Sequence, residues 1–415
     1  MAVPRPGWAE QNPEDWWKAT VESIRQVLAH AGGDRITGIG LTGQMHGLLL
    51  VDAHLNPLTN LITWQDTRAA AELPAWQEKI GPQAPARLGC RLSAGYGGAS
   101  LAWLARHGPL PEDARALSIA GFLAASLCAK AACDPTHAAS WGLYNLLAGC
   151  WDMPTIDALG IPPELLPILR PACLPLAHLS PSAQESLGLG PGVTVSSPLG
   201  DNQAGVYGLA GGDPQVLILN LGTGGQVSTP QAAYAHHSGL ETRPMPFQGF
   251  IQVGSSLCAG WSYAYLRQFY QAVLREIGGI ELSDEAVYER MNALVEGAAS
   301  DGLAFDTRFD GSRLEPWLRG SLTGIDTHNF SPAALTRALS EGMVEELYNL
   351  AQAAGLQDTH RIIAAGNAVR KNPTLAQVIS RRFGLHCEVS EHREEAALGA
   401  ALATAAGLRS AGLLD

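Results

Sequence analysis

Several features that define whole classes of protein are missing from this sequence. No run approaches the roughly 18 uninterrupted apolar residues of a membrane span, and the first twenty residues contain no apolar core of an export signal. Basic residues are also scarce, because 27 Lys and Arg stand against 39 Asp and Glu, a formal net charge of −12. A surface of that sign repels nucleic-acid phosphates and anionic lipids. We therefore expect a cytoplasmic protein with no membrane and no nucleic-acid partner.

The seven cysteines lack the spacing of a metal site or a disulfide framework. They are scattered between Cys90 and Cys387, their number is odd, and no two form a C-x-x-C pair. Structural zinc sites use closely spaced ligands, and disulfide scaffolds are short, cysteine-dense chains. The sequence therefore predicts free thiols in a reducing compartment.

Apolar residues are plentiful, at 46% of 415 residues, and only 16% are charged. Such a chain can bury a sizeable core, which excludes disorder, and its length suits two domains of roughly 200 residues each. The 46 Gly and 26 Pro residues follow no tripeptide period. This excludes a collagen-like fibre and suits many tight turns between regular elements.

Strand and helix patterns alternate along the chain, which is typical of an α/β protein. Glycine and proline cluster at Leu209–Pro214, and we therefore place a boundary there between a first domain, residues 1–209, and a second, residues 210–415. The expected strands are Arg35–Gly43, Gly47–Asp52, Leu61–Trp64, Val193–Pro198, Gln215–Gly222, Gly249–Ser256, Arg361–Gly366 and Leu385–Ser390, and the expected helices begin near Pro13, Asn202, Leu257, Asn372 and Glu395.

Two turns that follow predicted strands of the first half carry polar and aromatic side chains. Gln44, Met45 and His46 lie in LTGQMHG, and Trp64 and Asp66 lie in TWQDTR. Ligands of open α/β sheets bind at the carboxyl ends of the strands, and these side chains suit a polyol through hydrogen bonds and an apolar face. The alternatives are an ordinary turn histidine at His46 and a surface ion pair at Asp66.

Asp201, in PLGDNQAG, follows a strand and a glycine and precedes a predicted helix. A carboxylate in this place can accept the proton of a substrate hydroxyl that attacks phosphorus. The alternative is a helix cap, a common use of aspartate. Asp134 and His137, in CDPTHAAS, also bear acid–base groups, but their spacing predicts no role.

A glycine hairpin in the second half suits phosphate binding. Gly222, Thr223, Gly224 and Gly225 follow a buried strand in NLGTGGQVS, so that backbone N–H groups and one hydroxyl can approach phosphate oxygens. The segment matches neither the Walker loop nor G-x-G-x-x-G. A plain hairpin turn is the alternative.

A further turn, AAGNAVRKNP, contains Gly366, Asn367 and Asn372. Gly366 would let an adenine or ribose press against the backbone, and the two amides could hydrogen-bond it. The alternative is an ordinary turn into a helix that has Pro373 as its first residue.

Taken in this order, the segments resemble those of the FGGY family of carbohydrate kinases, part of the actin/hexokinase-like superfamily of two-domain ATPases. GQMHG and ITWQDTR are similar to the family's sugar-binding strand ends, and GDNQAG to its catalytic-base segment. LNLGTGGQVS is similar to its second phosphate hairpin, and AAGNAVRKNPTLAQVISRRFG to its adenosine segment. The resemblance covers essentially the whole chain and implies two ribonuclease-H-like α/β domains that close over a cleft.

The resemblance also implies a reaction, the phosphorylation of a ketose by ATP with Mg²⁺. Asp201 is the implied catalytic base, the five side chains of the first two turns bind the ketose, and Thr223 with its three glycines binds phosphate. Gly366, Asn367 and Asn372 line the implied adenosine site, and the metal ligands are left open. The segments GDNQAGVYG and ETRPMPFQGF are more similar to sedoheptulokinase-like members than to xylulokinases, which implies sedoheptulose as the substrate and its 7-phosphate as the product. Xylulose or another pentulose is the alternative, and a homodimer is left open.

One feature of the family has no counterpart in this sequence. Family members begin with a β-hairpin whose Asp-x-Gly-Thr-Thr loop binds the γ-phosphate, whereas here a segment similar to one downstream of it, GWAEQNPEDWW, starts at Gly7. We therefore expect an incomplete first domain with an exposed sheet edge. This leaves open a function of another class, a sugar- or nucleotide-binding protein that does not transfer phosphate.

Overall fold

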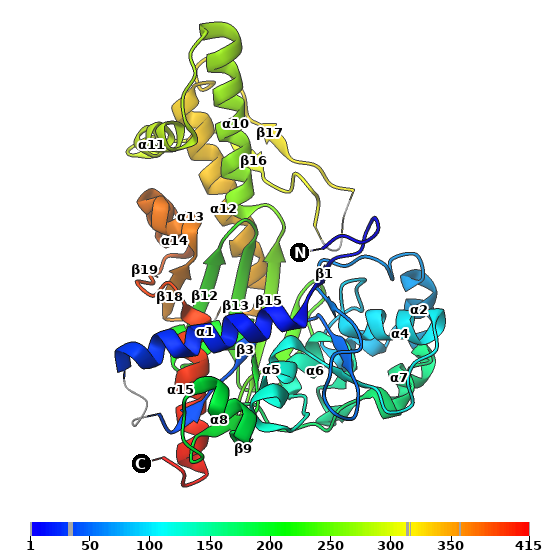
Figure 1. The fold of residues 1–415 in the computed structure, drawn as a ribbon. Helices are drawn as coiled ribbons and strands as arrows, with labels where there is room; N and C mark the ends of the chain where they lie inside the picture. The colour runs from blue at the N-terminus through cyan, green and yellow to red at the C-terminus, as the bar shows by residue number, and fades with distance from the viewer. Residues whose placement is uncertain (1, 32–35, 313–314, 316, 357, 415) are drawn as a thin grey trace.

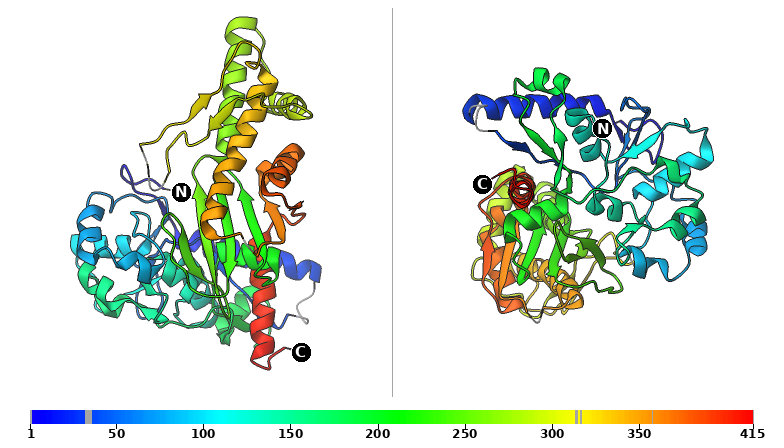
Figure 2. Two further views of the ribbon diagram at one scale, coloured as in Figure 1. Left: turned by 180° about the vertical axis from the view of Figure 1, so that it is seen from behind. Right: turned by 90° about the horizontal axis from the view of Figure 1, so that it is seen from below.

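The computed structural model describes residues 2–31, 36–312, 315, 317–356 and 358–414. They form an α/β structure of two lobes (Figures 1 and 2). We call the elements up to α9 (Asp201–Ala210) the first lobe and those from β12 (Val216–Leu221) onward the second lobe. The N-terminus lies on the first lobe near the gap between the lobes, and the C-terminus lies at the far end of the last helix.

The second lobe is built on a six-stranded sheet with the strand order β14-β15-β13-β12-β18-β19. Its strands β12, β18 and β19 are parallel to one another, and β13, β14 and β15 are joined antiparallel. The elements are β12 (Val216–Leu221), β13 (Gly225–Gln231), β14 (Glu241–Pro244), β15 (Phe250–Ser256), α10 (Ala259–Gly278), α11 (Asp284–Val295), β16 (Ala304–Asp306), β17 (Ser321–Thr323), α12 (Pro332–Ala354), β18 (Arg361–Ala365), α13 (Asn367–Lys371), α14 (Pro373–Phe383), β19 (Cys387–Val389) and α15 (Glu395–Ser410).

Alternate residues of β12 pack on opposite faces of this sheet, because successive side chains of a strand point to opposite sides. Leu217 and Leu219 belong to the core formed with α10, α11, α12 and α14. Val216 and Ile218 pack on the other face against Val206 of α9 (Asp201–Ala210). The helix that begins with Asp201 therefore lies directly against the sheet of the second lobe.

The first lobe contains shorter strands and more helices. The sheet β2-β10-β9 has three strands, and β11-β3, β1-β5, β4-β6 and β7-β8 are two-stranded. The elements are β1 (Glu10–Gln11), α1 (Pro13–Ala31), β2 (Gly38–Ile39), β3 (Thr42–Gly43), β4 (Leu49–Val51), β5 (Leu61–Ile62), α2 (Leu73–Ile80), α3 (Ala84–Leu88), α4 (Gly97–His107), β6 (Arg115–Leu117), α5 (Ile119–Cys128), α6 (Pro135–Ser140), β7 (Tyr144–Asn145), β8 (Cys150–Trp151), α7 (Met153–Leu159), a 3₁₀ turn (Pro163–Leu165), β9 (Pro175–His178), α8 (Pro181–Leu187), β10 (Thr194–Ser196), β11 (Leu199–Gly200) and α9.

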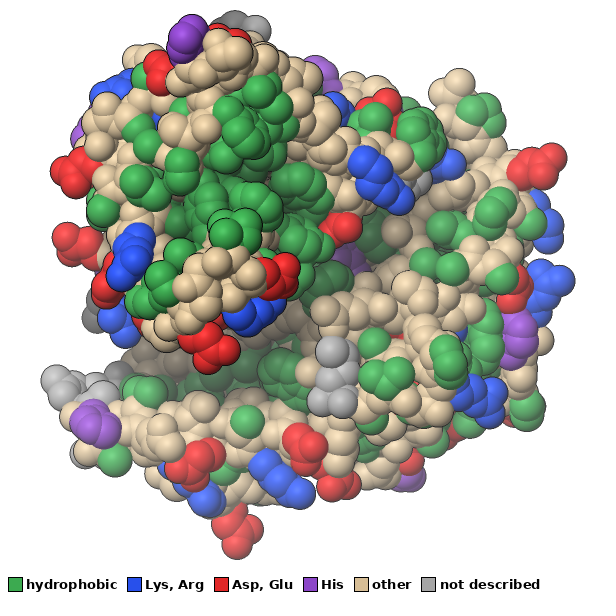
Figure 3. Space-filling model, turned by 90° about the horizontal axis from the view of Figure 1, so that it is seen from above, with side chains coloured by type: hydrophobic (Ala, Val, Ile, Leu, Met, Phe, Trp, Pro, Cys, Tyr) green, Lys and Arg blue, Asp and Glu red, His purple; other side chains and the backbone are tan. Residues whose placement is uncertain are grey.

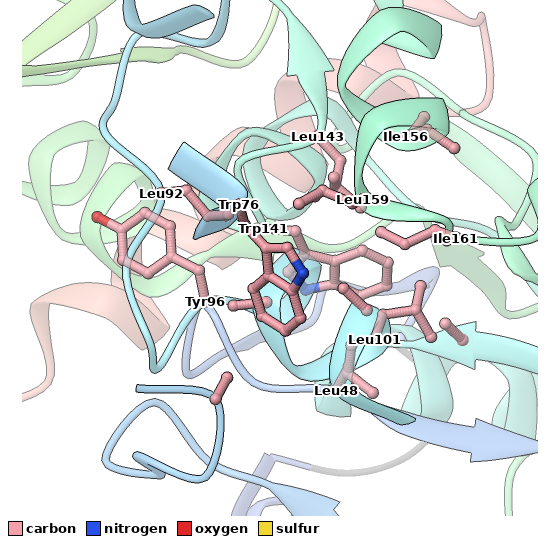
Figure 4. Packing of buried hydrophobic residues seen from close by; sticks show 14 of the residues in the cluster. Leu48, Trp76, Leu92, Tyr96, Leu101, Trp141, Leu143, Ile156, Leu159 and Ile161 are labelled. Atoms are coloured by element: carbon pink, nitrogen blue, oxygen red, sulfur yellow. The ribbon is translucent and has the colours of Figure 1, made fainter. Parts of the chain in front are cut away.

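An apolar cluster of the first lobe supports one wall of the site described below. Trp141 is fully buried and packs in this cluster with Trp76, Leu101 and other side chains (Figure 4). Tyr96 lies at the edge of the cluster, and its hydroxyl points away from Trp76 and Trp141. The cluster therefore fixes the ring of Tyr96 and leaves its polar end for a partner outside the core.

The predicted elements are present, most of them with shorter ends. The expected helix at Pro13 is α1, that at Asn202 begins one residue earlier as α9, and that at Leu257 begins at Ala259 as α10. The predicted strand Arg35–Gly43 is divided into β2 and β3, and its first residue lies outside the described residues. The boundary placed at Leu209–Pro214 coincides with the end of α9.

Two helices from opposite ends of the chain cross without space for side chains between them. A Cβ atom at Gly399 of α15 would collide with the carbonyl oxygen of Ala204 in α9, and one at Gly208 would collide with that of Glu395. Farther along α15, Thr404 lies 2.9 Å from Ser196 of β10, oxygen to oxygen. The C-terminal helix therefore packs against the first lobe.

An apolar stripe runs along the exposed face of α10. Trp261, Tyr265, Phe269, Val273 and Ile277 follow at four-residue spacing and are all exposed. In the space-filling view, apolar side chains form a continuous patch on the second lobe, at the upper left, and a hollow lies between the lobes next to it (Figure 3). Such a patch is typical of a contact surface, and the homodimer stays a prediction.

Candidate active site

Two parallel strands bring the first polar turn and Asp201 to the same sheet edge. Strand β3 pairs with β11 in parallel, with Gly43 opposite Gly200. Gln44 follows β3 directly and Asp201 follows β11, so both residues leave the strands at their carboxyl ends. A Cβ atom at Gly200 would lie 3.0 Å from Sδ of Met45. Glycine at this position therefore lets the methionine pack next to the turn that carries Asp201.

His46 is fixed in an uncommon backbone conformation. Its φ is +71°, a left-handed value that costs of order 1–3 kcal/mol for residues other than glycine. Ser140 of α6 holds it twice, because its Oγ accepts the His46 N–H at 3.0 Å and its carbonyl oxygen lies 2.7 Å from Nδ1 of the ring. The ring stacks on Tyr96 with centroids 4.4 Å apart. Helix α6 therefore positions this predicted ketose ligand.

Gln44 and Trp64 of the first lobe are both accessible to a ligand. Gln44 is half-buried, and its Nε2 donates to Oε1 of Gln11 at 2.8 Å. The Trp64 side chain is 54% exposed. Met45, also a predicted ketose ligand, is only 3% exposed and lies under the turn. A ligand can therefore reach Gln44 and Trp64 directly, whereas Met45 offers at most an edge.

Asp66 does not face open space. Its side chain is fully buried, and its oxygens accept hydrogen bonds from the Ala9 N–H at 2.7 Å and from the Arg68 backbone, Nε and Nη2, each at 2.9 Å. Arg68 also binds Glu10 at 2.6 Å. This carboxylate already accepts four hydrogen bonds from Ala9 and Arg68 and so holds the strand end in place. Its predicted contact with a sugar stays a prediction, against which this burial argues.

The second lobe contributes an arginine to the site that sequence reasoning missed. Arg243 of β14 is 4% exposed, and its Nη1 lies 3.3 Å from Oδ1 of Asn202 and 3.9 Å from Sδ of Met45. Glu241 accepts from Nη2 of Arg243 at 2.6 Å and from the hydroxyl of Tyr96. One polar cluster therefore joins both lobes next to Asp201. The sequence held only one sign of it, the ETRP segment.

Burial and neighbouring groups act in opposite directions on the pKa of Asp201. The side chain reaches solvent, but the protein atoms crowded around it raise its pKa above the ordinary aspartate value, while His137, the Asn202 N–H and Arg243 act in the opposite direction. Burial lowers the pKa of Arg243, but Glu241 and other neighbours outweigh it and raise the pKa overall. A raised pKa brings a carboxylate closer to the value that suits a general base.

The glycine hairpin lies between β12 and β13 and supports the start of α10. Gly222 and Thr223 accept hydrogen bonds through their carbonyl oxygens from the N–H groups of Gly260 and Trp261, each at 3.0 Å. A Cβ atom at Gly224 would lie 2.8 Å from the Ser256 carbonyl oxygen. Glycine is therefore required at this tip for space, and Thr223 is exposed there.

The side chain of Asn202 connects the Asp201 turn to the strand that leaves the hairpin. Its Nδ2 donates to Oε1 of Gln226 at 2.8 Å and lies 3.3 Å from Oγ of Ser228. Gln226 directly follows Gly225, the last of the predicted phosphate-binding residues. The carboxylate and the glycine hairpin are therefore brought to neighbouring positions, although they belong to different lobes.

The turn that contains Gly366, Asn367 and Asn372 also adjoins β12. Gly366 has φ +97°, and a Cβ atom there would collide with the Leu221 carbonyl oxygen. Asn367 is exposed at the start of α13, whereas Asn372 is 5% exposed and its Oδ1 has no hydrogen-bond partner among the described residues. An unpaired acceptor is costly when buried. Asn372 therefore has the capacity for a partner that the protein does not supply.

A cavity of about 610 Å³ opens beside the first polar turn. Glu10, Gln11, Asn12 and Asn60 contribute to its walls, and Gln11 is the residue that accepts the hydrogen bond of Gln44. None of the predicted site residues lines this cavity. It is connected to them through the Gln11–Gln44 contact and through Glu10, which binds Arg68, the partner of Asp66.

The described part of the chain contains neither a cluster of metal-binding side chains nor a helix that could span a membrane. No group of three or more His, Cys, Asp or Glu side chains is arranged to hold a metal ion. No helix there is both long enough and apolar enough to cross a membrane.

Two family models match the chain and together cover most of it. The N-terminal domain of the FGGY family of carbohydrate kinases matches residues 1–208, and the C-terminal domain of that family matches residues 219–408. The proposed boundary between residues 209 and 210 falls between the two matches and stays a prediction.

Curated relatives carry several substrate names. The chain is 24% identical to the xylulose kinase of Staphylococcus xylosus, over 98% of this chain and 84% of the relative. It is 27% identical to the sedoheptulokinase of Homo sapiens, over 88% and 80%, and 28% identical to the glycerol kinase of Gloeobacter violaceus, over 97% and 81%. The names therefore agree on the chemistry and differ in the substrate.

Solved structures show the same fold. The xylulose kinase of Rhodospirillum rubrum matches with a TM-score of 0.88 at 21% identity, and the match covers 99% of this chain and 83% of the chain of that kinase. The gluconate kinase of Lactobacillus acidophilus has a TM-score of 0.87 at 20% identity, and the Plasmodium falciparum glycerol kinase with ADP has 0.85 at 20%, each with the same coverage. The two-domain, actin-like ATPase arrangement expected from the sequence is confirmed.

Proposed function

Because the chain belongs to the FGGY family of carbohydrate kinases, we propose that it transfers the terminal phosphate of ATP to a ketose. Sedoheptulose, giving sedoheptulose 7-phosphate, is the substrate we place first, and xylulose or another pentulose is second. Support comes from the sedoheptulokinase and xylulose kinases among its relatives and from the polar turn at Gln44–His46.

Asp201 is the proposed catalytic base. It accepts the proton of the terminal hydroxyl while that oxygen forms its bond to the γ-phosphorus and the bond from phosphorus to the β,γ-bridging oxygen breaks. The neighbouring Asn202 and Arg243 hold the turn through their 3.3 Å contact. Catalysis then depends mainly on positioning and on the charge balance around Asp201.

The residues of the second lobe fit a nucleotide. ATP supplies the phosphoryl group, and its phosphates would be held by Thr223 and the glycines on either side of it, where a Cβ atom at Gly224 would block the tip. Gly366, Asn367 and the unpaired oxygen of Asn372 would hold the adenosine. Mg²⁺ would be held by phosphate oxygens, water and at most one or two carboxylates, as is usual for this ion.

The ketose side rests on fewer residues than the sequence predicted. We propose that Gln44, His46 and Trp64 contact the sugar, that Met45 supplies an apolar edge, and that Arg243 points its guanidinium toward the same space. Asp66 keeps a structural role. The observation that carries the proposal is the pair of Asn202 contacts, to Gln226 and to Arg243, which joins the base, the hairpin and the sugar-side turn.

The substrate is tested by measuring ADP release with sedoheptulose, xylulose, glycerol, gluconate and no sugar. We expect kcat/KM to be highest for sedoheptulose, with little ADP release in the absence of a sugar. Turnover with xylulose above that with sedoheptulose would move the assignment to a pentulose kinase. Binding of a ketose and ADP without turnover by any sugar would instead support the non-catalytic alternative.

The variant Asp201→Asn tests the base. We expect kcat to fall by at least ~100-fold, the usual size of a general-base effect, while the dissociation constant of the ketose, measured by calorimetry, stays nearly constant. Asp157→Asn, an exposed aspartate of α7, is the control and should have normal activity. Near-normal turnover of Asp201→Asn would remove this residue from the mechanism.

A further inference from the structure

A buried carboxylate–imidazole pair lies in helix α6, beside the segment that carries Asp201. Asp134 and His137 are both fully buried, and Nδ1 of His137 is 2.5 Å from Oδ2 of Asp134. Asp134 also caps α6, because its Oδ1 accepts the Thr136 N–H at 2.9 Å and the Thr136 hydroxyl. The pair is therefore held in one geometry. The reaction described above gives neither residue a role.

Thr136 connects this pair to the base by a hydrogen bond. Its Oγ1 accepts the N–H of Gly200 at 2.8 Å, and Gly200 directly precedes Asp201. The same helix holds His46 through Ser140. Helix α6, with only six residues, therefore contacts both the turn that bears the base and the turn proposed to bind the ketose.

Two charges and one backbone group face His137. Asp134 caps its helix and Asp201 begins α9. The backbone of Gly43 in β3 approaches the ring, while Nε2 makes no hydrogen bond among the described residues. Burial lowers the pKa of His137, but Asp134 and then Asp201 outweigh burial and raise it overall. In the opposite direction, His137 lowers the pKa of Asp201, which protein crowding raises.

Other titratable groups near Asp134 stay neutral at pH 7. Burial and the Asp134 charge raise the pKa of the Cys133 thiol, and they do the same for the Cys173 thiol. Burial, Cys150 and Asp134 raise the pKa of the Tyr144 hydroxyl. The charged groups that act on the imidazole are therefore the carboxylates of Asp134 and Asp201, and Arg243 acts on Asp201 from the second lobe.

We propose that Asp134 and His137 are positioning residues for the base. Asp134 holds His137 as an imidazolium, and the positive charge of His137 favours the ionised form of the neighbouring Asp201 carboxylate. This inference rests on the proposed function and deepens it. His137 keeps its proton throughout turnover, and the proton of the substrate hydroxyl goes to Asp201. The pair therefore sets the pH range in which the base is ready, without touching substrate.

The test compares His137→Asn with Thr136→Val. His137→Asn removes the positive charge, so the pKa of Asp201 should rise and the acid limb of the kcat–pH profile should move to higher pH. We expect a shift of roughly one unit, which is about a tenfold loss of kcat on the acid side. Thr136→Val removes the hydrogen bonds to Gly200 and to Asp134 but leaves the imidazole of His137 in place. It should therefore lower kcat while the acid limb of the profile stays closer to its wild-type position than in His137→Asn. A profile that does not move in folded His137→Asn would overturn the proposal.

A second readout does not depend on activity. Infrared titration of protein labelled with ¹³C-aspartate, with the Asp201 band identified by its loss in Asp201→Asn, gives the protonation midpoint of this carboxyl group directly. We expect a higher midpoint in His137→Asn and in Asp134→Asn than in the wild type. An active Asp201→Asn enzyme would refute the proposed base, whereas an unchanged midpoint would refute only the role of His137.

A measurement on the wild-type protein covers the case in which these buried variants do not fold. Neutron diffraction at pH 7 shows the ring protons of histidine directly. Protons on both Nδ1 and Nε2 of His137 are the expected result, and a single ring proton would refute the imidazolium.

Discussion

The tripeptide Asp-Thr-Arg occurs once in each lobe, as Asp66–Arg68 and as Asp306–Arg308. In both copies Oδ1 accepts from the arginine N–H and Nε, at 2.9 and 2.9 Å in the first and at 3.1 and 2.9 Å in the second, and Oδ2 accepts from Nη2. The side chains of the first pair are 0% and 3% exposed, and those of the second are 27% and 35% exposed. Identical local chemistry therefore forms the same hydrogen bonds in two different surroundings.

Burial changes what the first pair contributes. Arg68 is enclosed by Glu10, which it contacts at 2.6 Å, and by the ring of Trp8, whose centroid lies 3.8 Å away. An unpaired charge in such a place is costly, whereas water can replace a lost partner at Arg308. The tripeptide therefore determines the hydrogen-bond geometry of the Asp–Arg pair, and the surrounding fold determines how much the pair contributes to stability.

The largest effect is expected for Asp66→Asn. This change leaves Arg68 with one fewer carboxylate in a buried position, and breaking a buried ion pair costs several kcal/mol. We expect the free energy of unfolding, measured with urea, to fall by about 3 kcal/mol. The KM for the ketose should stay unchanged in the fraction that is folded. A raised KM with normal stability would return Asp66 to the list of sugar ligands.

An intermediate effect is expected for Arg68→Lys. Lysine keeps the charge, but it cannot form the forked contacts with Asp66 or stack on Trp8 as a planar guanidinium does. We expect a loss of about 1.5 kcal/mol in the free energy of unfolding, roughly half of that for Asp66→Asn. Arg308→Lys, in the exposed copy, is the matched control and should change stability little. Equal losses in both variants would show that burial does not distinguish the copies.

The smallest effect is expected for Asp306→Asn, and it should depend on pH. The hydrogen bonds from Arg308 lower the pKa of Asp306 below the ordinary aspartate value, even though burial acts against them. A lowered folded-state pKa stabilises the protein above the ordinary value and loses this contribution as the pH falls through the lowered one. The variant should therefore be less stable by up to about 1 kcal/mol at pH 7. This difference should decrease below about pH 4, and one that grew on acidification would contradict it.

The sequence allowed the elements and the glycine turns to be predicted, because both follow from local patterns. The period of α1 and the buried run of β12 are examples, and Gly366 has the left-handed conformation that a turn with close backbone contact requires. Each of these depends on residues within a few positions of one another. The correspondence between predicted and observed elements is therefore good wherever local chemistry decides.

The remaining features of the site depend on contacts between distant parts of the chain. The burial of Asp66 follows from Ala9 and Glu10, more than fifty positions earlier. Arg243 comes from the other lobe, and the role proposed for His137 depends on the contact of Thr136 with Gly200, 64 positions later. A turn that carries an acid looks the same in the sequence whether its partner is water, an arginine or a substrate.

The crossing of α9 and α15 means that the last helix supports α9, the helix that begins with the proposed base, Asp201. Glu395–Ser410 touches α9 where no methyl group would fit, and Thr404 is bound to Ser196, 208 positions away. If the lobes rotate during a reaction cycle, the pivot must pass near this crossing, because the two helices cannot slide past each other without collisions between their backbones. Removing the last twenty or so residues would thus loosen Asp201 from the opposite end of the polypeptide.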